Sequence, residues 1–318
     1  MLDQKPLNKL LFIDIETTSQ KNNFSELTEH QQELFKKRFK KDVESEINKK
    51  IELLKITDKI NLSDVVSEVE VKKTTKKKTP TLSADALEEK IKKEVCQSLY
   101  DVKGPIHCEF SRILCVSCGV LWKNQDENFY NIKIISFYDE DEKKILVDFI
   151  NHPKLSEIFG KIPGKFDKNR DLYWALVGHN ISVFDLPVLS KRMIINGLKP
   201  PAMFDVAHLK SWDLADVIID TKSAWSFNVF DNSTSLELLC DIFNVPTPKD
   251  GISGADVKDV FYKEKNLKKI AEYCEKDVVA LARVYLRMKS MPEEIKVFNP
   301  VVTTEINTSV EKKEETPA

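Results

Sequence analysis

The sequence LLFIDIETTS, residues 10–19, decides how this chain begins to fold. Four apolar residues lead into Asp14, and Ile15 separates that residue from Glu16. A short apolar run of this kind is typical of a buried β-strand. Side chains alternate along a strand, so both carboxylates point to the same side of its C-terminal end. Charges placed there are costly unless something binds them. On this pair alone, the alternative that both begin a loop and face water stays open.

Composition sets wide bounds on the function. The chain has 318 residues, which is enough for one large domain or two ordinary ones. Its 42% hydrophobic content supports a packed core, and its 31% charged content, above the usual quarter, predicts charged insertions or tails. The formal net charge of -2 neither indicates nor excludes a nucleic-acid partner, because local patches of opposite sign cancel in the sum.

The cysteines favour a structural role and a reducing compartment. Six cysteines in a chain of this length do not make a disulfide scaffold. Cys115 and Cys118 form a CxxC pair, but within an apolar, strand-like run and without a second ligand pair, so core packing is favoured over zinc or redox chemistry. No signal sequence and no apolar run of membrane-spanning length is present, and we expect a cytoplasmic protein with no membrane contact.

The order of expected elements predicts an α/β fold. Strands are expected at 10–15, 111–122, 131–141 and 172–180, and helices at 142–152, 185–198, 234–243 and 266–289. Two neighbouring strands joined by a polar turn, followed by strand–helix alternation, predict a mixed sheet with helices on its faces. The glycine-rich motifs that cradle nucleotide phosphates are absent from the sequence.

A charged insertion at about 20–104 interrupts this pattern. Apolar residues recur there every three or four positions, which predicts two amphipathic helices. They are Phe35, Phe39, Val43, Ile47, Ile51 and Leu54, then Leu87, Ile91, Val95 and Leu99. Between them, VKKTTKKKTP at 71–80 predicts a disordered linker, with a nucleic-acid contact as the alternative. The segment 291–318, rich in Pro, Thr, Glu and Lys, is predicted to be disordered.

Two further acidic positions require an explanation. Asp185 follows a short strand where a helix begins, and on its own it is explained as a helix-capping residue. Tyr273 and Asp277 stand four residues apart and therefore share one helical face. Because Asp277 borders the apolar stripe of that helix, its charge needs a partner, either a cationic side chain or a metal ion.

Four carboxylates without supporting histidines favour hard cations. Clustered carboxylates raise one another's pKa unless cations intervene. Mg²⁺ or Mn²⁺ suits such an oxygen-rich set better than Zn²⁺. Two such ions stabilise both the attacking and the leaving oxygen at phosphorus.

At this point the sequence resembles a known family. FIDIET, GHNISVFD and EYCEKD match, in order, the three motifs of DEDD 3′–5′ exonucleases, and the tyrosine four residues before the last aspartate is typical of the DEDDy subgroup. The chain is similar to stand-alone bacterial exonucleases related to the proofreading domain of family B DNA polymerases. The likeness covers most of residues 8–22 and 105–290. It implies a ribonuclease H-like mixed β-sheet of about five strands with helices on both faces, in a single exonuclease domain at 1–290.

The resemblance also implies roles for particular residues. Asp14, Glu16, Asp185 and Asp277 would hold two divalent ions, with Asp14 bridging them. Tyr273 would help position and deprotonate the attacking water, alongside Glu16. Since a phenol with a pKa of about 10 is a poor base at neutral pH, orientation is its more plausible task. The expected contacts with the substrate come from the backbone near Ile15 and Thr17 and from Asn180 and Phe184, which line the path of the strand.

Three cationic residues are further candidates for contact with phosphate. Lys249, in the loop PTPKDGISGADV, would meet a phosphate, although an ordinary turn explains that loop equally well. Lys191 and Arg192 are expected on a helix surface, with phosphate contact as the alternative.

The expected activity is metal-dependent 3′–5′ hydrolysis of single-stranded DNA to nucleoside 5′-monophosphates. Two alternatives remain: a 3′–5′ exoribonuclease, because no 2′-hydroxyl contact can be identified, and a non-cleaving nucleic-acid-binding module of the same fold. A replication or DNA repair protein is a further expected partner, through the insertion.

Overall fold

The computed structural model describes residues 5–66, 84–123, 129–163, 169–209, 214, 216–227, 229, 234–246, 251–292 and 294–298. The chain divides into two compact units, which are treated separately below. Unit 1 comprises residues 1–18 and 112–318, and unit 2 comprises residues 19–111. No helix in the ranges just given combines the length and the apolar character that crossing a bilayer requires.

Within the described residues, unit 1 is built on one mixed sheet of six strands. Their order across the sheet is β5-β4-β1-β2-β3-β6. The strands are β1 (Leu10–Ser19), β2 (Ser111–Lys123), β3 (Tyr130–Tyr138), β4 (Ala175–Gly178), β5 (Ile218–Asp220) and β6 (Ile295–Phe298). The pairs β1–β4, β4–β5 and β3–β6 are parallel, whereas β2 and β3 form the antiparallel pair that the polar turn predicts.

Strand β1 lies inside the sheet because its apolar run has partners on both faces. Leu10 to Ile13 are all nearly inaccessible, in contrast to the one-sided burial of an edge strand. The ring of Phe12 packs 5.5 Å from that of Tyr285, on α11 (Leu267–Met288). Since side chains alternate, Asp14 and Glu16 share this face and point toward α11.

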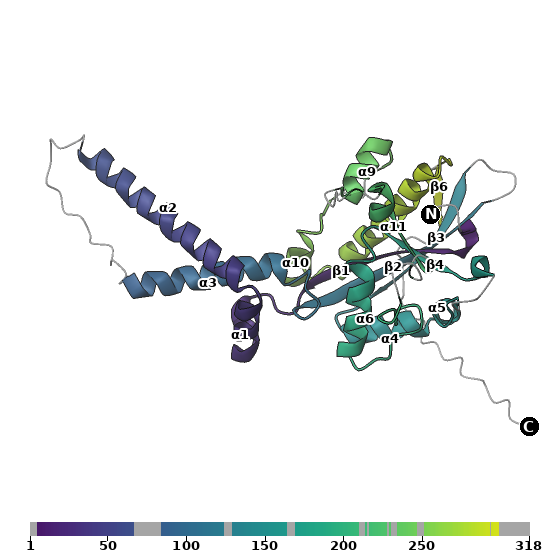
Figure 1. Ribbon diagram of the computed structural model, residues 1–318, viewed down its shortest axis with the longest axis horizontal. Coiled ribbons are helices and arrows are strands. Elements are labelled where there is room, and N and C mark those ends of the chain that lie inside the picture. Colours follow the sequence, from purple (N-terminus) through teal and green to yellow (C-terminus); the bar gives the residue numbers. More distant parts are fainter. Residues whose placement is uncertain are drawn as a thin grey trace, which may run out of the picture. The chain divides into compact units, whose positions relative to one another are not determined.

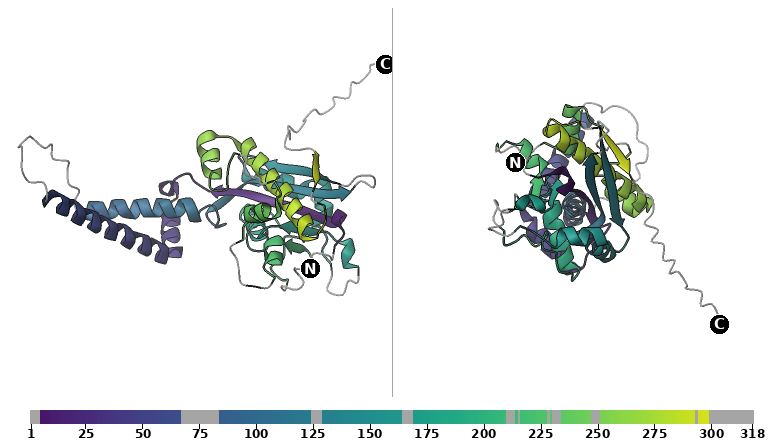
Figure 2. Two further views of the ribbon diagram at one scale, coloured as in Figure 1. Left: turned by 90° about the horizontal axis from the view of Figure 1, so that it is seen from above. Right: turned by 90° about the vertical axis from the view of Figure 1, so that its right-hand side faces the viewer.

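Helices cover both faces of the sheet (Figure 1). Seen from above, α11 lies across the sheet (Figure 2, left), and its apolar stripe packs on β1 and β3. On the other face, α4 (Glu142–Asn151) brings Phe149 against Phe137 of β3, with ring centroids 5.6 Å apart. The remaining helical segments of unit 1 are η1 (Leu7–Lys9), α5 (Pro153–Phe159), η3 (Arg170–Leu172), α6 (Asp185–Ile195), α8 (Thr221–Trp225), α9 (Leu236–Phe243), α10 (Val257–Asp259) and the π-helical turn η4 (Val260–Glu264).

A buried ion pair holds α6 against α4. Glu142 accepts hydrogen bonds from both Nε (2.8 Å) and Nη2 of Arg192, and a third from the Ile113 amide of β2 at 2.8 Å. Asn196 donates to the same carboxylate at 3.0 Å. Arg192 is therefore buried and paired, which corrects the expectation that it lies on the helix surface. Because Asp185 begins α6, this pair also fixes the position of that residue.

The fold is the expected ribonuclease H-like α/β architecture, with six strands instead of about five. The added strand β6 pairs with β3 in the register Tyr130 with Ile295 to Lys133 with Phe298. The prediction that 291–318 is disordered is therefore wrong for 295–298. These residues form a strand because they pair with the edge strand β3, and such a distant partner cannot be predicted from the local sequence. The segment 299–318 lies outside the described residues.

Unit 2 is helical and has its own core. It contains η2 (Phe24–Glu26), α1 (Glu29–Arg38), α2 (Lys40–Val66) and α3 (Ala84–Lys103). Figure 1 draws α2 and α3 side by side as a hairpin. The second predicted stripe lies on α3 as expected, whereas the first is divided between α1 and α2, because α1 ends before Phe39. Aromatic rings fill the core, with Phe35 in contact with Phe24, Phe39, Tyr100 and Phe110. The run at 71–80 lies outside the described residues.

Replacing Glu142 by alanine should destabilise unit 1 by about 3–5 kcal/mol, because Arg192 would remain buried without its counter-charge. Urea unfolding followed by tryptophan fluorescence measures this selectively, because all 4 tryptophans lie in residues 112–318.

The matched control is Lys144→Ala on the same helix. Lys144 pairs with Asp139 at 2.7 Å but is half exposed, so its loss should cost less than about 1 kcal/mol. Equal losses of unfolding free energy in the two variants would contradict the view that the buried Glu142–Arg192 pair stabilises unit 1.

Candidate active site

Three carboxylates from two distant parts of the chain meet beside β1. Asp14 and Glu16 extend from the strand, and Asp277 extends from α11 toward them. One oxygen of each lies within 4.8 Å of the others. Glu16 and Asp277 are 8% exposed, so water gives their charges little solvation. The three side chains form what we call the acidic cluster.

Asp185 lies beside this cluster but is not one of its three mutually close members. It is the first residue of α6, only 4% exposed, and its carboxylate forms a hydrogen bond with the backbone of Ile15. That bond places it next to the β1 acids, since Ile15 lies between Asp14 and Glu16. The structure thus gathers all four acids that the sequence singled out, with Asp185 at the margin.

Burial and mutual repulsion hold these carboxyls toward their neutral forms. Burial is the main reason why the pKa of Asp14 is raised well above its usual range, and the charges of Asp277, Asp185 and Glu16 add to it. Burial followed by the charge of Asp277 raises the pKa of Glu16 in the same way. The pKa of Asp185 rises to about 7, again chiefly through burial.

Tyr273 stands one helical turn before Asp277 and is directed at it. The phenol donates a hydrogen bond to the Asp277 carboxylate. Burial, then the charges of Asp277, Glu16 and Asp14, raises the Tyr273 pKa well above its ordinary value of 10.0. The hydroxyl therefore stays protonated near neutral pH. This protonation state suits a donor that orients a neighbour and does not suit a base.

The thiol of Cys274 contacts Asp14. Its sulfur lies 3.4 Å from both the backbone oxygen and Oδ2 of Asp14. Burial raises the pKa of this thiol well above its usual value, so it remains an S–H donor. Sequence analysis missed this contact, although Cys274 adjoins the motif tyrosine. Cys115 and Cys118 are buried in β2, as their apolar context predicts.

Asp220 organises the loop that leads to Asp185. It ends β5, and its carboxylate accepts hydrogen bonds from the amides of Asn180 (3.0 Å) and Ser182 (3.1 Å). It also caps α8 through the amide of Lys222 at 3.0 Å. Sequence analysis missed Asp220, although an aspartate between the apolar run Val217–Ile219 and Thr-Lys-Ser is a recognisable helix-capping signal.

His179 has a structural role in the same loop. Its ring nitrogens lie 3.1 Å from the Thr221 hydroxyl and 3.1 Å from the Thr234 carbonyl oxygen. Burial lowers the pKa of the imidazole, which favours the neutral ring. Both ring nitrogens are thus engaged in contacts within the protein.

The expected substrate contacts fall into three groups. The side chains of Ile15 and Thr17 are buried, and alternation along β1 directs them to the face opposite the acidic cluster, so the backbone contact with substrate stays a prediction. Asn180, in the left-handed region at φ 66°, and the half-buried Phe184 belong to the loop before α6. Lys249 lies outside the described residues.

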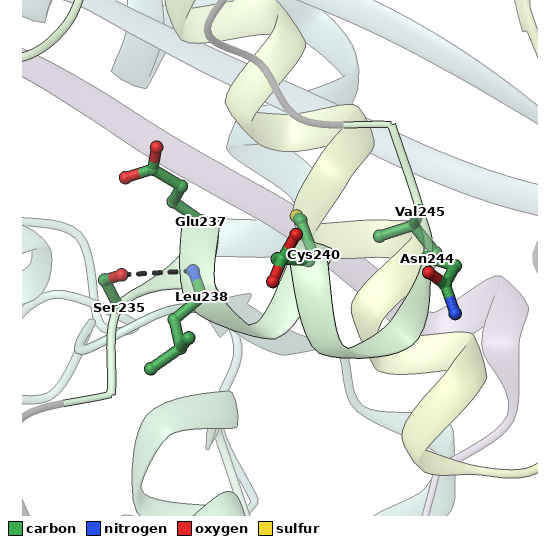
Figure 3. A pocket seen from close by; sticks show the side chains of 7 residues that line it. Ser235, Glu237, Leu238, Cys240, Asn244 and Val245 are labelled. Carbon is green, nitrogen blue, oxygen red and sulfur yellow. Dashed lines mark hydrogen bonds between the residues drawn. The ribbon is translucent and has the colours of Figure 1, made fainter.

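A surface depression of about 420 Å³ lies over α9 (Figure 3), and none of its lining residues belongs to the acidic cluster. Its lining includes two acids, Glu237 and Asp241, and no cation. A phosphate would be repelled there. The depression therefore does not serve as the anion-binding part of this site.

The donor set fits divalent metal ions. It offers only carboxylate oxygens, the ligands that Mg²⁺ and Mn²⁺ prefer, and it carries excess negative charge. Asp14, Glu16 and Asp277 would hold an ion directly, with Asp185 at the margin of the same site. When bound, such ions would polarise a phosphoryl oxygen and acidify a water molecule.

In EDTA, unit 1 should become less stable as pH rises from about 4 to about 7. Because the folded carboxyls have raised pKa values, the folded state holds more protons than the unfolded state in this interval, so deprotonation favours unfolding. Asp185→Asn should flatten this dependence and stabilise unit 1 at pH 7.5 by up to a few kcal/mol. Urea unfolding by tryptophan fluorescence at pH 5 and 7.5 measures both effects.

Asp148→Asn is the control, because Asp148 is 39% exposed in its side chain and forms only a 3.6 Å pair with Lys144. Its pH dependence should match that of the parent chain. A stability that rises between pH 5 and 7.5 in EDTA would contradict the repulsion argued above.

Comparison with known proteins agrees with this site. A search of curated proteins finds no match to the chain. A family model described as a predicted 3′–5′ exonuclease related to the exonuclease domain of PolB matches residues 106–315, well over half of the chain. The match includes Asp185, Tyr273 and Asp277, whereas Asp14 and Glu16 precede it and are joined to them by the fold. The chain therefore belongs to this family of predicted 3′–5′ exonucleases related to the exonuclease domain of PolB.

Proposed function

We propose that this chain is a DEDDy-type 3′–5′ exonuclease that removes nucleotides from single-stranded DNA with the help of two Mg²⁺ or Mn²⁺ ions. The observation that carries the proposal is the acidic cluster, whose three carboxylates each place an oxygen within 4.8 Å of the others. Tyr273, bonded to Asp277, supports the DEDDy assignment.

In the proposed reaction, a water oxygen attacks the terminal phosphorus and the bond between phosphorus and the 3′ oxygen breaks. The products are a nucleoside 5′-monophosphate and a strand shortened by one nucleotide. Asp14, Glu16, Asp185 and Asp277 bind the ions. Tyr273 acts as a donor that orients the groups around Asp277, since even the ordinary pKa of a tyrosine, 10.0, makes the phenol a poor base near neutral pH.

The division into units suggests how the chain is organised. We assign the catalytic domain to residues 1–290, with the insertion at about 20–104 corresponding to most of unit 2. Docking of a replication or DNA repair protein on that insertion belongs to the same proposal.

The direct test uses 5′-labelled DNA and RNA strands of one sequence, with Mn²⁺ or Mg²⁺. We expect the DNA to shorten one nucleotide at a time and to release mononucleotides, whereas a blocked 3′ end should resist. Asp14→Asn should reduce the rate on the order of 10³-fold, because metal ions supply several kcal/mol of transition-state stabilisation.

Three outcomes would change the assignment. Faster shortening of RNA would favour the exoribonuclease. Tight binding without mononucleotide release would identify a non-cleaving module. Activity that persists in Asp14→Asn would indicate a contaminating nuclease.

Tyr273→Phe should lower the rate on the order of ten- to a hundredfold, the value of one or two hydrogen bonds to charged groups. Metal affinity, measured by calorimetry, should change by less than about threefold, because no ligand oxygen is removed.

Tyr262→Phe is the matched control, since Tyr262 and Tyr273 are partly buried against the same apolar cluster. It should keep nearly full activity. An unchanged rate in Tyr273→Phe would remove the proposed role of that hydroxyl.

A further inference from the structure

Unit 2 carries a dense group of exposed cations where α1 ends and α2 begins. The group consists of Lys36, Lys37, Arg38, Lys40 and Lys41, which we call the basic junction. All five are exposed, and only Phe39 interrupts them. None of these residues takes part in the proposed hydrolysis.

The basic junction differs from most other described lysines of the α2–α3 hairpin, which form salt bridges. On the hairpin, Lys49 pairs with Glu46 at 2.6 Å and Lys50 with Glu94 at 3.1 Å. Lys92 and Lys93 pair with the acids four residues earlier in the same way, at 2.6 and 2.9 Å.

At the junction, by contrast, Lys40 has one weak pair at 3.7 Å, to Glu44. Lys36, Lys37, Arg38 and Lys41 form no salt bridge with any residue that the structure describes. Their charge is therefore available to an external anion.

Helix electrostatics explain only part of this group. Lys36, Lys37 and Arg38 lie in the last turn of α1, where the helix dipole favours cations. Lys40 and Lys41 begin a helix of 27 residues, where the dipole favours anions instead. Two cations at a positive helix end add to the attraction for a negatively charged ligand.

The aromatic core of unit 2 anchors the backbone of the basic junction. Phe39 is 7% exposed, and its ring packs 4.7 Å from Phe35 and 4.8 Å from His107. Lys36 extends over the Phe24 ring and Arg38 over the Phe39 ring, each at 5.8 Å from the centroid. Cations carried on an anchored helical backbone lose less conformational entropy on binding than those of a flexible lysine tail.

We propose that the basic junction is an accessory binding site for the phosphate backbone of single-stranded nucleic acid, outside the nucleotides that occupy the acidic cluster. The inference rests on the proposed function, since the strand is its substrate. A row of unpaired cations without a buried polar pocket matches repeated phosphates, which need charge and no base-specific geometry.

The test uses Lys37→Gln, Arg38→Gln and Lys41→Gln together, which remove three unpaired charges and keep side chains that favour helices. Fluorescence anisotropy in EDTA measures affinity for a labelled 30-nucleotide strand and a 5-nucleotide strand without cleavage. For the long strand we expect a loss of about tenfold or more and a salt dependence shallower by about 2 in log–log slope, since each phosphate contact contributes about 0.7.

The matched control is Lys49→Gln, Lys92→Gln and Lys93→Gln, three lysines of the same unit that are already paired. This variant should bind the long strand nearly as the parent does. Equal losses in both variants would overturn the proposal, because they would show a general effect of net charge. Circular dichroism of both variants checks that unit 2 remains helical.

A second readout separates this inference from the proposed function. With Mn²⁺, hydrolysis of a trinucleotide should be unchanged in the junction variant, because the three substitutions leave the acidic cluster intact. If the parent chain hydrolyses no strand at all, the proposed function fails, and long-strand binding in EDTA still decides the junction.

Unchanged affinity of the junction variant for the long strand would overturn the proposed site, whatever the activity. Displacement of the strand by poly-glutamate at equal charge concentration, as effective as displacement by unlabelled strand, would also overturn it. That result would assign the surface to an acidic protein segment.

Discussion

The repulsion among buried carboxylates beside β1 is the constraint on which the rest of unit 1 depends. Asp14, Glu16 and Asp277 have oxygens within 4.8 Å of one another, in a place where water screens them poorly. If the elements that carry these acids could move, the folded chain would relieve this repulsion by moving the acids apart. These elements are instead a central strand and a 22-residue helix packed on it, neither of which moves without disrupting the core.

Other polar groups in unit 1 extend this support to the margin of the site. Glu142 and Arg192 join α4 to α6, and Asp220 holds the loop that leads into α6. The Cys274 thiol donates to Asp14, so one of the acids is held by a neutral donor that adds no charge. None of these groups neutralises the acidic cluster. They stabilise the positions of its carboxylates.

Local pattern made much of this predictable, and long-range pairing accounts for what was missed. The alternation in LLFIDIETTS places Asp14 and Glu16 on one face, and the four-residue spacing does the same for Tyr273 and Asp277. Strands β5 and β6 have three and four residues, too short for a periodic signal, and exist because β4 and β3 offer them edges. Burial of Arg192 depends on Glu142, 50 residues away, and no local window contains both. The fold brings the motifs FIDIET and EYCEKD together. From the sequence, only the family resemblance predicted that they meet.

The net charge of -2 conceals a separation of charge that suits a polyanionic substrate. Without metal, the acidic cluster repels a phosphodiester, so affinity at that site has to come from bound cations. The basic junction carries its own positive charge and needs no metal to attract a phosphate. Binding of a long strand and hydrolysis of its end are therefore expected to depend on different cations, lysine and arginine side chains for the first and divalent metal ions for the second. Under these two proposals, retention of the strand needs no metal ion, and only hydrolysis requires metal ions in the acidic cluster.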